Sequence, residues 1–281
     1  MELHKLDRFP SVAASAVSSL VTSELSGKSV HALVFELGGT TFNETHINNI
    51  RVRLDGRDIV NAISGTQLKE LNEYDGYTSV TNYLFLFFGD PTARTVRGQH
   101  MGDMDLSIYD APLEIEVDLG AATAPTLQMY AIAGVPKMAM GVGFDQIEAA
   151  HFRHLRRSII EPTAAVSRNS YSVSLGSRAG ARIRKIGFFH TNLTSVELRK
   201  NSLYKWDDVS AALNNAVSQQ YARVPQSGLY VLDRIVDGNQ GEAETTATPE
   251  GKPWHIELNL STSASDTITA FADLHAAMPM I

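Results

Sequence analysis

Two stretches of the chain carry the same order of apolar and polar positions. Residues 113–133 (LEIEVDLGAATAPTLQMYAIA) and residues 254–274 (WHIELNLSTSASDTITAFADL) align without a gap at an offset of 141 residues. Each copy contains an alternating segment, a loop of small residues and a second apolar segment. Alternation with a period of two is typical of strands with one buried face, so each copy predicts an antiparallel strand pair.

The repeat indicates two copies of one domain, because its offset is near half of the 281 residues. The apolar positions that coincide are Ile115 with Ile256, Val117 with Leu258, Leu119 with Leu260, Leu127 with Ile268, and Tyr130 with Phe271. We predict a first domain with its N-terminal arm over residues 1–133, a linker with a short helix over residues 134–166, and a second domain over residues 167–281.

Further strands are expected on both sides of each copy. Asp55 and Gly56 between two alternating arms predict a β-hairpin over residues 50–60. Residues 11–25 are expected to form an edge strand, and the apolar run at 82–90 a strand buried on both faces. The other strands are expected at residues 30–37, 105–110, 171–177, 181–189, 195–206 and 228–238.

Three segments have apolar residues at helical spacing, at residues 65–76, 144–160 and 205–217. The apolar positions expected to face the core are Leu68 and Leu71 in the first, Ile147, Phe152 and Leu155 in the second, and Val209, Leu213 and Val217 in the third.

Short strands at regular spacing, with Gly, Pro and Asn turns, indicate an all-β fold. We predict two tandem eight-stranded jelly-roll β-sandwiches, a double jelly roll, with short helices in the loops between strands. An immunoglobulin-like sandwich is the alternative. The lack of Cys and the helices between strands count against it.

Composition excludes several classes of function. The formal net charge of −7 argues against attraction of the whole protein to nucleic acid or anionic lipid, although local basic patches stay open, and we expect no sequence-specific nucleic-acid binding. The sequence has no Cys, which excludes disulfides, thiolate metal sites and a thiol nucleophile. The first 15 residues lack the features of a secretory signal, and the apolar run at 126–144 contains Pro136 and Lys137, so we expect neither export nor a membrane span there.

No catalytic constellation stands out, and we expect no enzyme activity, no catalytic residue and no cofactor. There is no G-x-S-x-G turn, and the GGTT turn at 38–41 lacks the Lys of a phosphate-binding loop. Glu116 and Glu257 occupy equivalent positions in the two copies. Equivalent strands of separate domains do not share one cleft, so we interpret both as solvent-facing strand residues.

Metal ligands are not identified by the sequence. His151 and His154 are close together on the expected helix at 144–160, but a third ligand is not evident. Asp103 and Asp105 in GDMDLS leave a structural calcium ion or other cation open, although the pair lacks a full set of oxygen ligands.

Arg153, Arg156 and Arg157 concentrate positive charge in an acidic chain. Two roles are open for this basic cluster. It contacts phospholipid head groups, or it forms ion pairs between subunits or domains. We prefer the second.

The order of several segments resembles the double jelly-roll major capsid proteins of tailless, membrane-containing icosahedral bacteriophages, most closely the corticovirus type. The segments are LDRFPSVAAS (6–15), INNIRVRLDGR (47–57), HLRRSI (154–159) and RIRKIGFFHTNLTSVELRKNSLYKW (182–206). The resemblance covers most of the chain and depends on the order of these segments. The loop at 238–253 is outside the resemblance, and its polar composition predicts an outward-facing position.

The resemblance implies a coat protein that forms pseudo-hexagonal homotrimers, which tile an icosahedral shell over an internal membrane. The implied partners are further copies of the chain, other capsid proteins at the vertices and the viral membrane. The implied location is the virion, after assembly in the bacterial host cytoplasm. Two alternatives stay open at this point, a tandem jelly-roll carbohydrate-binding protein and a β-sandwich glycan-active enzyme.

Overall fold

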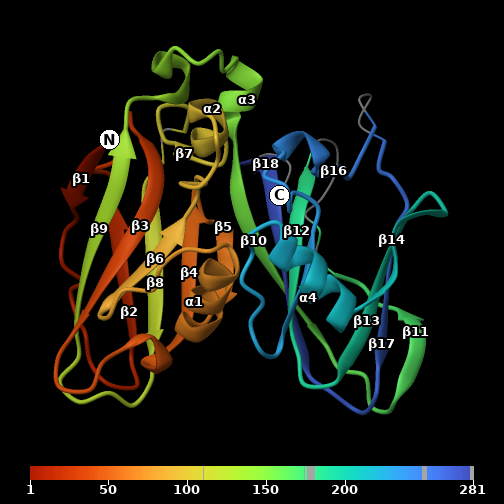
Figure 1. The fold of residues 1–281 in the computed structure, drawn as a ribbon. Helices are drawn as coiled ribbons and strands as arrows, with labels where there is room; N and C mark the ends of the chain where they lie inside the picture. Colours follow the sequence, from red (N-terminus) through yellow and green to blue (C-terminus); the bar gives the residue numbers. More distant parts are fainter. Residues whose placement is uncertain (110, 174, 176–180, 249–251, 279–281) are drawn as a thin grey trace. The chain divides into compact units, whose positions relative to one another are not determined.

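A computed structural model describes residues 1–109, 111–173, 175, 181–248 and 252–278. The chain divides into two compact units. Unit 1 comprises Met1–Asn72 and Tyr77–His154, and unit 2 comprises Glu73–Gly76 and Leu155–Ile281. Each unit is built from two antiparallel sheets (Figure 1). Among the described helices, none combines the length and the apolar composition of a membrane span.

The two sheets of unit 1 have the strand orders β1-β9-β3-β6 and β2-β8-β4-β5. The first consists of β1 (Glu2–Lys5), β9 (Thr126–Gly134), β3 (Ser29–Gly38) and β6 (Tyr83–Phe87). The second consists of β2 (Val17–Thr22), β8 (Leu113–Leu119), β4 (Ile47–Leu54) and β5 (Arg57–Ile63). A short strand, β7 (Met104–Asp105), also pairs with β3.

The two sheets of unit 2 have the orders β10-β18-β12-β15 and β11-β17-β13-β14. The first consists of β10 (His151–Ile160), which enters from unit 1, β18 (Ile268–Ala277), β12 (Arg182–Phe189) and β15 (Leu229–Asp233). The second consists of β11 (Val166–Ser170), β17 (Ile256–Thr262), β13 (Leu193–Lys200) and β14 (Leu203–Ser210). A short strand, β16 (Glu244–Thr245), pairs with β12.

The two units share one topology. In unit 1, β8 lies between β2 and β4, and β9 lies between β1 and β3. In unit 2, β17 takes the place of β8 and β18 takes the place of β9. A helix follows the hairpin in both units, α1 (Gly65–Tyr74) in unit 1 and α4 (Ala211–Gln220) in unit 2. The double jelly roll predicted from the repeat is therefore confirmed.

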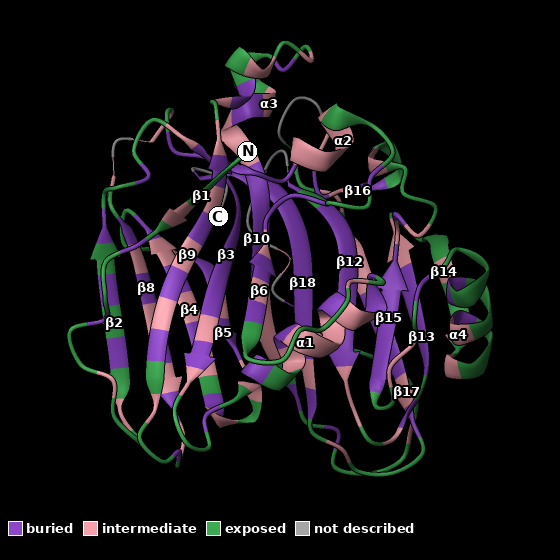
Figure 2. Ribbon diagram, turned by 60° about the vertical axis from the view of Figure 1, so that its left-hand side comes forward, coloured by how far each residue is buried: buried purple, intermediate pink, exposed green. Residues whose placement is uncertain are grey.

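Local sequence explains how these strands form. β8 alternates strictly between buried and half-buried residues, with Ile115 and Val117 fully buried. Asp55 and Gly56 join β4 to β5 with φ angles of 52° and 69°. Positive φ at both central residues matches the twist of the flanking strands, so the predicted hairpin is confirmed. Figure 2 shows the buried stripes that run along the strands of both units.

The remaining helices are short. They are α2 (Val96–His100), α3 (Gln146–Ala150) and the 3-10 turns η1 (Glu44–His46), η2 (Lys137–Met140) and η3 (Gln240–Glu242). The helix expected over 144–160 is wrong for most of its length, because only α3 is helical and β10 begins at His151. β-branched and aromatic residues in FRHLRRSII fit a strand, and a capping box around Asp145 fixes the start of α3.

Other expectations also differ from the structure. The strand expected at 105–110 is found only at Asp105, the last residue of β7, because residues 106–108 form a turn; residue 110 lies outside the described residues. Residues 205–217 are divided between β14, which ends at Ser210, and α4, for which Ser210 is the N-cap. β6 alternates in burial and exposes Tyr83, so it is buried on one face and not on both. Its apolar run is explained by half-buried Phe85 and Phe87, whose rings stack 5.4 Å apart. The edge strand expected within 11–25 is confirmed as β2. Of the strand expected at 171–177, residues 174, 176 and 177 lie outside the described residues, and residues 171–173 are not in a strand.

Candidate assembly surface

An apolar stripe lies on the exposed side of α4 and the turn that follows it. The stripe consists of Leu213, Val217, Tyr221 and Val224, which are 55%, 38%, 50% and 49% exposed. The sequence pattern had predicted that Leu213 and Val217 face the core, and that prediction is wrong. Exposed apolar residues gathered on one helix face are typical of surfaces that contact a partner.

Polar residues occupy the inner side of α4 and fix its orientation. Asn214 is buried, and its side-chain amide donates a hydrogen bond of 3.0 Å to the carbonyl of Val231. Ser218, one turn later, is buried with its hydroxyl 3.2 Å from the hydroxyl of Tyr74. Asn214 and Ser218 are four residues apart, so they share one helix face. The polar pair Asn214 and Ser218 has the same helical spacing as the apolar pair Leu213 and Val217. The spacing of the apolar residues alone did not show that the polar pair is the buried one.

Both units also leave apolar residues on edge strands. In unit 1, β2 pairs with β8 along one side, and its outer face carries Val17 and Val21, which are 59% and 60% exposed. In unit 2, β14 is an edge strand with Leu203 and Tyr204 exposed. Edge strands with exposed apolar side chains tend to associate with other chains.

Tyr204 is held in place by two arginines of unit 2. Its hydroxyl accepts hydrogen bonds from Arg168 (3.0 Å) and Arg199 (2.8 Å), and the Arg199 guanidinium lies 4.5 Å from the ring centroid. Both arginines also pair with buried Glu197, at 2.5 and 2.7 Å. The exposed ring is therefore ordered before any partner binds.

Glu116 lies in an ion-pair ladder on the outer face of the β2-β8-β4-β5 sheet. It pairs with Arg51 (3.1 Å) and Arg53 (3.5 Å), and Arg53 also pairs with Asp58 (3.1 Å). Its repeat partner Glu257 lies opposite Arg199 in the strand register and accepts a hydrogen bond of 3.1 Å from Asn259. Both glutamates are half-buried strand residues, and they belong to separate units.

The structure distributes the three arginines of the basic cluster along β10. Arg153 is 7% exposed, and its guanidinium donates a hydrogen bond of 2.7 Å to the carbonyl of Phe87 in unit 1. Arg156 and Arg157 are half-buried residues of unit 2. Successive side chains of a strand point to opposite faces. The three arginines are therefore not gathered on one face, as they would be on the helix expected at 144–160.

The other sequence-predicted candidates are also separated. His151 lies at the start of β10, where its Nδ1 is 2.5 Å from the carbonyl oxygen of Ile147. His154 is fully buried, with its ring centroid 4.2 Å from that of Phe152. Alternation along β10 places the two histidines on opposite faces, so they form no metal pair.

Asp103 and Asp105 are buried, and each has its own donors. Asp105 accepts hydrogen bonds from the backbone N–H of Lys137 (2.7 Å) and the hydroxyl of Ser107 (2.6 Å). Asp103 accepts from two histidines that the sequence analysis did not connect to it, His31 and His100. Among the described residues, Asp103 and Asp105 do not belong to a common group of three or more possible metal ligands.

Lys137 is a fully buried cation in unit 1. Its Nζ donates hydrogen bonds to the carbonyls of Met101 (2.9 Å) and His151 (2.6 Å). Burial lowers the pKa of Lys137 to about 8, although Asp103 and Asp105 favour its charged form. Its ammonium group therefore connects η2 to the turn after α2 and to the first residue of β10.

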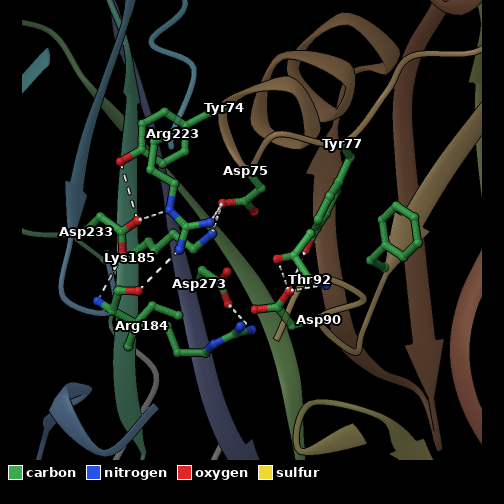
Figure 3. Close-up of polar contacts among 12 residues, drawn as sticks. Tyr74, Asp75, Tyr77, Asp90, Thr92, Arg184, Lys185, Arg223, Asp233 and Asp273 are labelled. Atoms are coloured by element: carbon green, nitrogen blue, oxygen red, sulfur yellow. Dashed lines mark hydrogen bonds and ion pairs between the residues drawn. The ribbon is translucent and has the colours of Figure 1, made fainter. Parts of the chain in front are cut away.

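Unit 2 contains a buried network of two acids and two bases (Figure 3). Asp75 contacts Lys185 in a direct ion pair and lies 3.5 Å from Arg223, which also pairs with Asp233 at 3.4 Å. The hydroxyl of Tyr74 lies 3.4 Å from Asp233. Burial raises the pKa of Asp233, and Lys185 and Arg223 oppose that shift. Tyr74 and Asp75 belong to the four-residue segment that unit 2 takes from the first half of the chain.

Two family models cover nearly all of the chain. The model for the N-terminal domain of viral coat protein P2 matches residues 3–136, and the model for its C-terminal domain matches residues 152–278. No curated protein matches the chain.

Solved structures show the same fold at low sequence identity. The major capsid protein P2 from bacteriophage PM2 has a TM-score of 0.81 and 17% identity, over 98% of this chain and 97% of that chain. The major capsid protein of Sulfolobus turreted icosahedral virus has a TM-score of 0.70 and 14% identity, over 99% and 98%. A capsid structure of the virus PBCV-1 has a TM-score of 0.59 and 10% identity, over 99% and 95%.

The family and the fold are those of a structural protein of the virion, which associates with further copies of itself in the capsid. Together, the two matched domains, the duplicated topology and the whole-chain likeness to solved capsid proteins identify this chain as a viral major coat protein of the P2 family, folded as a double jelly roll.

Proposed function

We propose that three copies of the chain form a homotrimer with a pseudo-hexagonal outline, which tiles an icosahedral shell. The observation that carries this proposal is the shared topology of the two units, with sheets of the same strand order in each. Three chains with two similar domains each supply six similar sandwiches around one axis. A near-sixfold outline needs this duplication, because true threefold symmetry acts on whole chains.

The apolar stripe of α4 contacts another copy of the chain in this trimer. A helix on the surface of a monomer normally buries its apolar face and exposes its polar face. In α4 the apolar stripe is exposed and the buried positions are polar. Subunit interfaces of homo-oligomers are more apolar than the remaining surface. The edge strand β2, with Val17 and Val21, supplies a second surface of the same kind in unit 1.

The shell encloses an internal membrane, and other capsid proteins occupy its vertices. This part of the proposal is supported by the resemblance to membrane-containing phages. Assembly takes place in the bacterial host cytoplasm, which suits a chain without Cys. Arg156 and Arg157 supply the charge for subunit or head-group contacts, whereas Arg153 acts inside unit 1. Within the segment 238–253, β16 pairs with β12 and Glu244 is buried, so the part that faces outward in this proposal is the largely exposed stretch 238–242. Residues 249–251 lie outside the described residues.

Electron microscopy of the purified protein tests the trimer. Class averages with six lobes around one axis are expected from three double sandwiches. Averages with two lobes, at every protein concentration examined, would contradict the proposal.

Vesicle flotation tests the membrane contact separately. A head-group contact predicts that vesicles of phosphatidylcholine with phosphatidylglycerol bind the protein and that vesicles of phosphatidylcholine alone do not, whereas ion pairs between subunits predict binding to neither. The double variant Arg156→Gln, Arg157→Gln should lose binding, whereas Arg8→Gln with Arg94→Gln, two exposed arginines, should keep it. Equal loss in both variants would show a general effect of charge and remove the role of Arg156 and Arg157.

A further inference from the structure

Two histidines and one aspartate of unit 1 converge on one point. His31 lies on β3, His100 is the last residue of α2, and Asp103 lies just before β7. Nδ1 of His31 is 2.9 Å from Oδ1 of Asp103, and Nδ1 of His100 is 2.7 Å from Oδ2. One ligand atom from each of the three residues lies within 4.8 Å of the others. Among the described residues, this is the one group of three or more such side chains close enough to share an ion.

We propose that His31, His100 and Asp103 bind one divalent transition-metal ion, with zinc as the fitting metal and water as its fourth ligand. Two imidazoles and one carboxylate are a common three-residue ligand set for Zn²⁺, whereas Ca²⁺ prefers oxygen ligands alone. Two donors on one tetrahedral zinc ion, each at about 2.0–2.2 Å from it, lie roughly 3.3 Å apart. The observed distances of 2.9 and 2.7 Å join the two histidines to different oxygens of Asp103. Binding of one ion therefore needs these pairs to open by a few tenths of an ångström and the three ligand atoms, which lie within 4.8 Å of one another, to turn toward a common point.

The backbone beside the cluster leaves room for it. A Cβ atom on Gly89 would lie 2.2 Å from Nδ1 of His31 and 2.3 Å from Oδ1 of Asp103. The backbone N–H of Gly89 donates a hydrogen bond of 3.1 Å to the carbonyl of His31, which holds this chain segment against β3. Only glycine at this position permits the observed placement of both side chains. Gly89, which follows β6, is therefore part of the site.

The burial of the three residues suits an ion with one open position. Asp103 and His31 are 1% and 5% exposed, which fixes their orientation, while His100 is partly exposed. Solvent therefore reaches the cluster on the His100 side. Without the ion, Nδ1 of each histidine donates its proton in a hydrogen bond to Asp103. On metal binding, the proton of each imidazole moves to Nε2, and the lone pair of Nδ1 binds the ion.

The ion would connect β3 to the loop that contains α2 and β7. This chain has no Cys and therefore no disulfide to make such a link. The proposed role is structural, and it concerns unit 1 alone, so it does not depend on the trimer. The exposed pair of His4 and Glu2, 2.8 Å apart, offers a control with similar chemistry and no third ligand.

The test is a cobalt titration of the full-length protein after treatment with EDTA. Co²⁺ reports its coordination by visible absorption, and Zn²⁺ should displace it. The expected result is one ion per chain, four-coordinate cobalt bands and a higher melting temperature with Zn²⁺ than with EDTA. His100→Ala and Asp103→Asn should each weaken binding at least about tenfold, whereas His4→Ala should leave it unchanged. Gly89→Ala should weaken binding by displacing His31 and Asp103.

His100→Ala is the deciding variant if Asp103→Asn fails to fold, because His100 is the most exposed of the three. Binding of less than one-tenth equivalent of Co²⁺ to the folded wild-type protein would overturn the proposal. Binding that is unchanged in folded His100→Ala would overturn it as well. Either result would leave Asp103 as a carboxylate that accepts two hydrogen bonds and orients the loop.

Discussion

Leu119 and Leu260 occupy the same position in the two jelly rolls and are both fully buried. Leu119 lies on β8 opposite Ile47 of β4, and Leu260 lies on β17 opposite Val196 of β13. The offset of 141 residues that joins them in the sequence also joins the strands on which they lie. Each unit therefore has its own core, built from the same pairing of strands.

Truncation of either leucine should destabilise the protein strongly. Leu119→Ala and Leu260→Ala should each lower the free energy of unfolding by about 2–5 kcal/mol, because each leaves a cavity in a packed core. Leu203→Ala, at a position 66% exposed, should change it by less than about 0.5 kcal/mol. Urea unfolding measures all three. Equal effects of Leu203→Ala and Leu260→Ala would contradict the burial described here.

Asp75→Asn should destabilise unit 2, because Lys185 and Arg223 would then share Asp233 as their nearby carboxylate. Loss of one partner from a buried ion network costs about 3–5 kcal/mol. Asp207→Asn is the matched control, because Asp207 is an exposed residue of β14, and it should have little effect on the free energy of unfolding. Urea unfolding monitored by tryptophan fluorescence is suited to unit 2, which contains Trp206 and Trp254. Near-equal midpoints for the two variants would show that the network adds no stability.

Lys137 should make the stability of unit 1 rise at alkaline pH. Its pKa is lowered to about 8 in the folded state by burial, so between pH 8 and about 10.5 the unfolded chain binds more protons. Over this window, the free energy of unfolding of the wild-type protein should rise by up to about 1.4 kcal/mol per pH unit relative to that of Lys137→Met, which has no group to titrate at this position. Below pH 8 the difference between the two proteins should stay constant. Urea unfolding at pH 7, 8, 9 and 10 measures it. A difference that is flat across all four values would contradict the lowered pKa.

Acidic residues on the α4 stripe should break the trimer without unfolding the chain. The double variant Leu213→Glu, Val217→Glu replaces two exposed apolar side chains of the proposed interface with carboxylates. Burial of unpaired charge in an interface is unfavourable, so the trimer should dissociate. Ala212→Glu with Gln219→Glu adds the same residues on other exposed positions of α4 and should stay trimeric. Sedimentation velocity compares the two. Trimers in both variants would exclude α4 from the interface.

The sequence repeat predicted the fold well because core positions are set by local alternation. Strict alternation in β8 and the Asp55-Gly56 turn each depend on residues close together in the chain, and both are confirmed. The helix prediction at 144–160 was wrong because Phe152 and Leu155 are also buried in a strand once β10 begins at His151, whereas Ile147 lies on α3 and is exposed. Spacing alone does not distinguish the two for short apolar runs.

The candidate sites were predicted less well, because they depend on contacts between distant segments. His31 and Asp103 are 72 residues apart, and nothing local connects them. The α4 stripe shows the opposite problem, since the helical spacing of Leu213 and Val217 was recognised but their direction was not. The buried positions Asn214 and Ser218 decide that direction, and they do so through partners on other elements, Val231 and Tyr74.

The absolute mass of the purified protein, measured by light scattering after size exclusion, tests the assembly account most directly. Three chains of 30.7 kDa give about 92 kDa, and this mass should persist on dilution. A mass of 30.7 kDa at every concentration would contradict the preformed trimer.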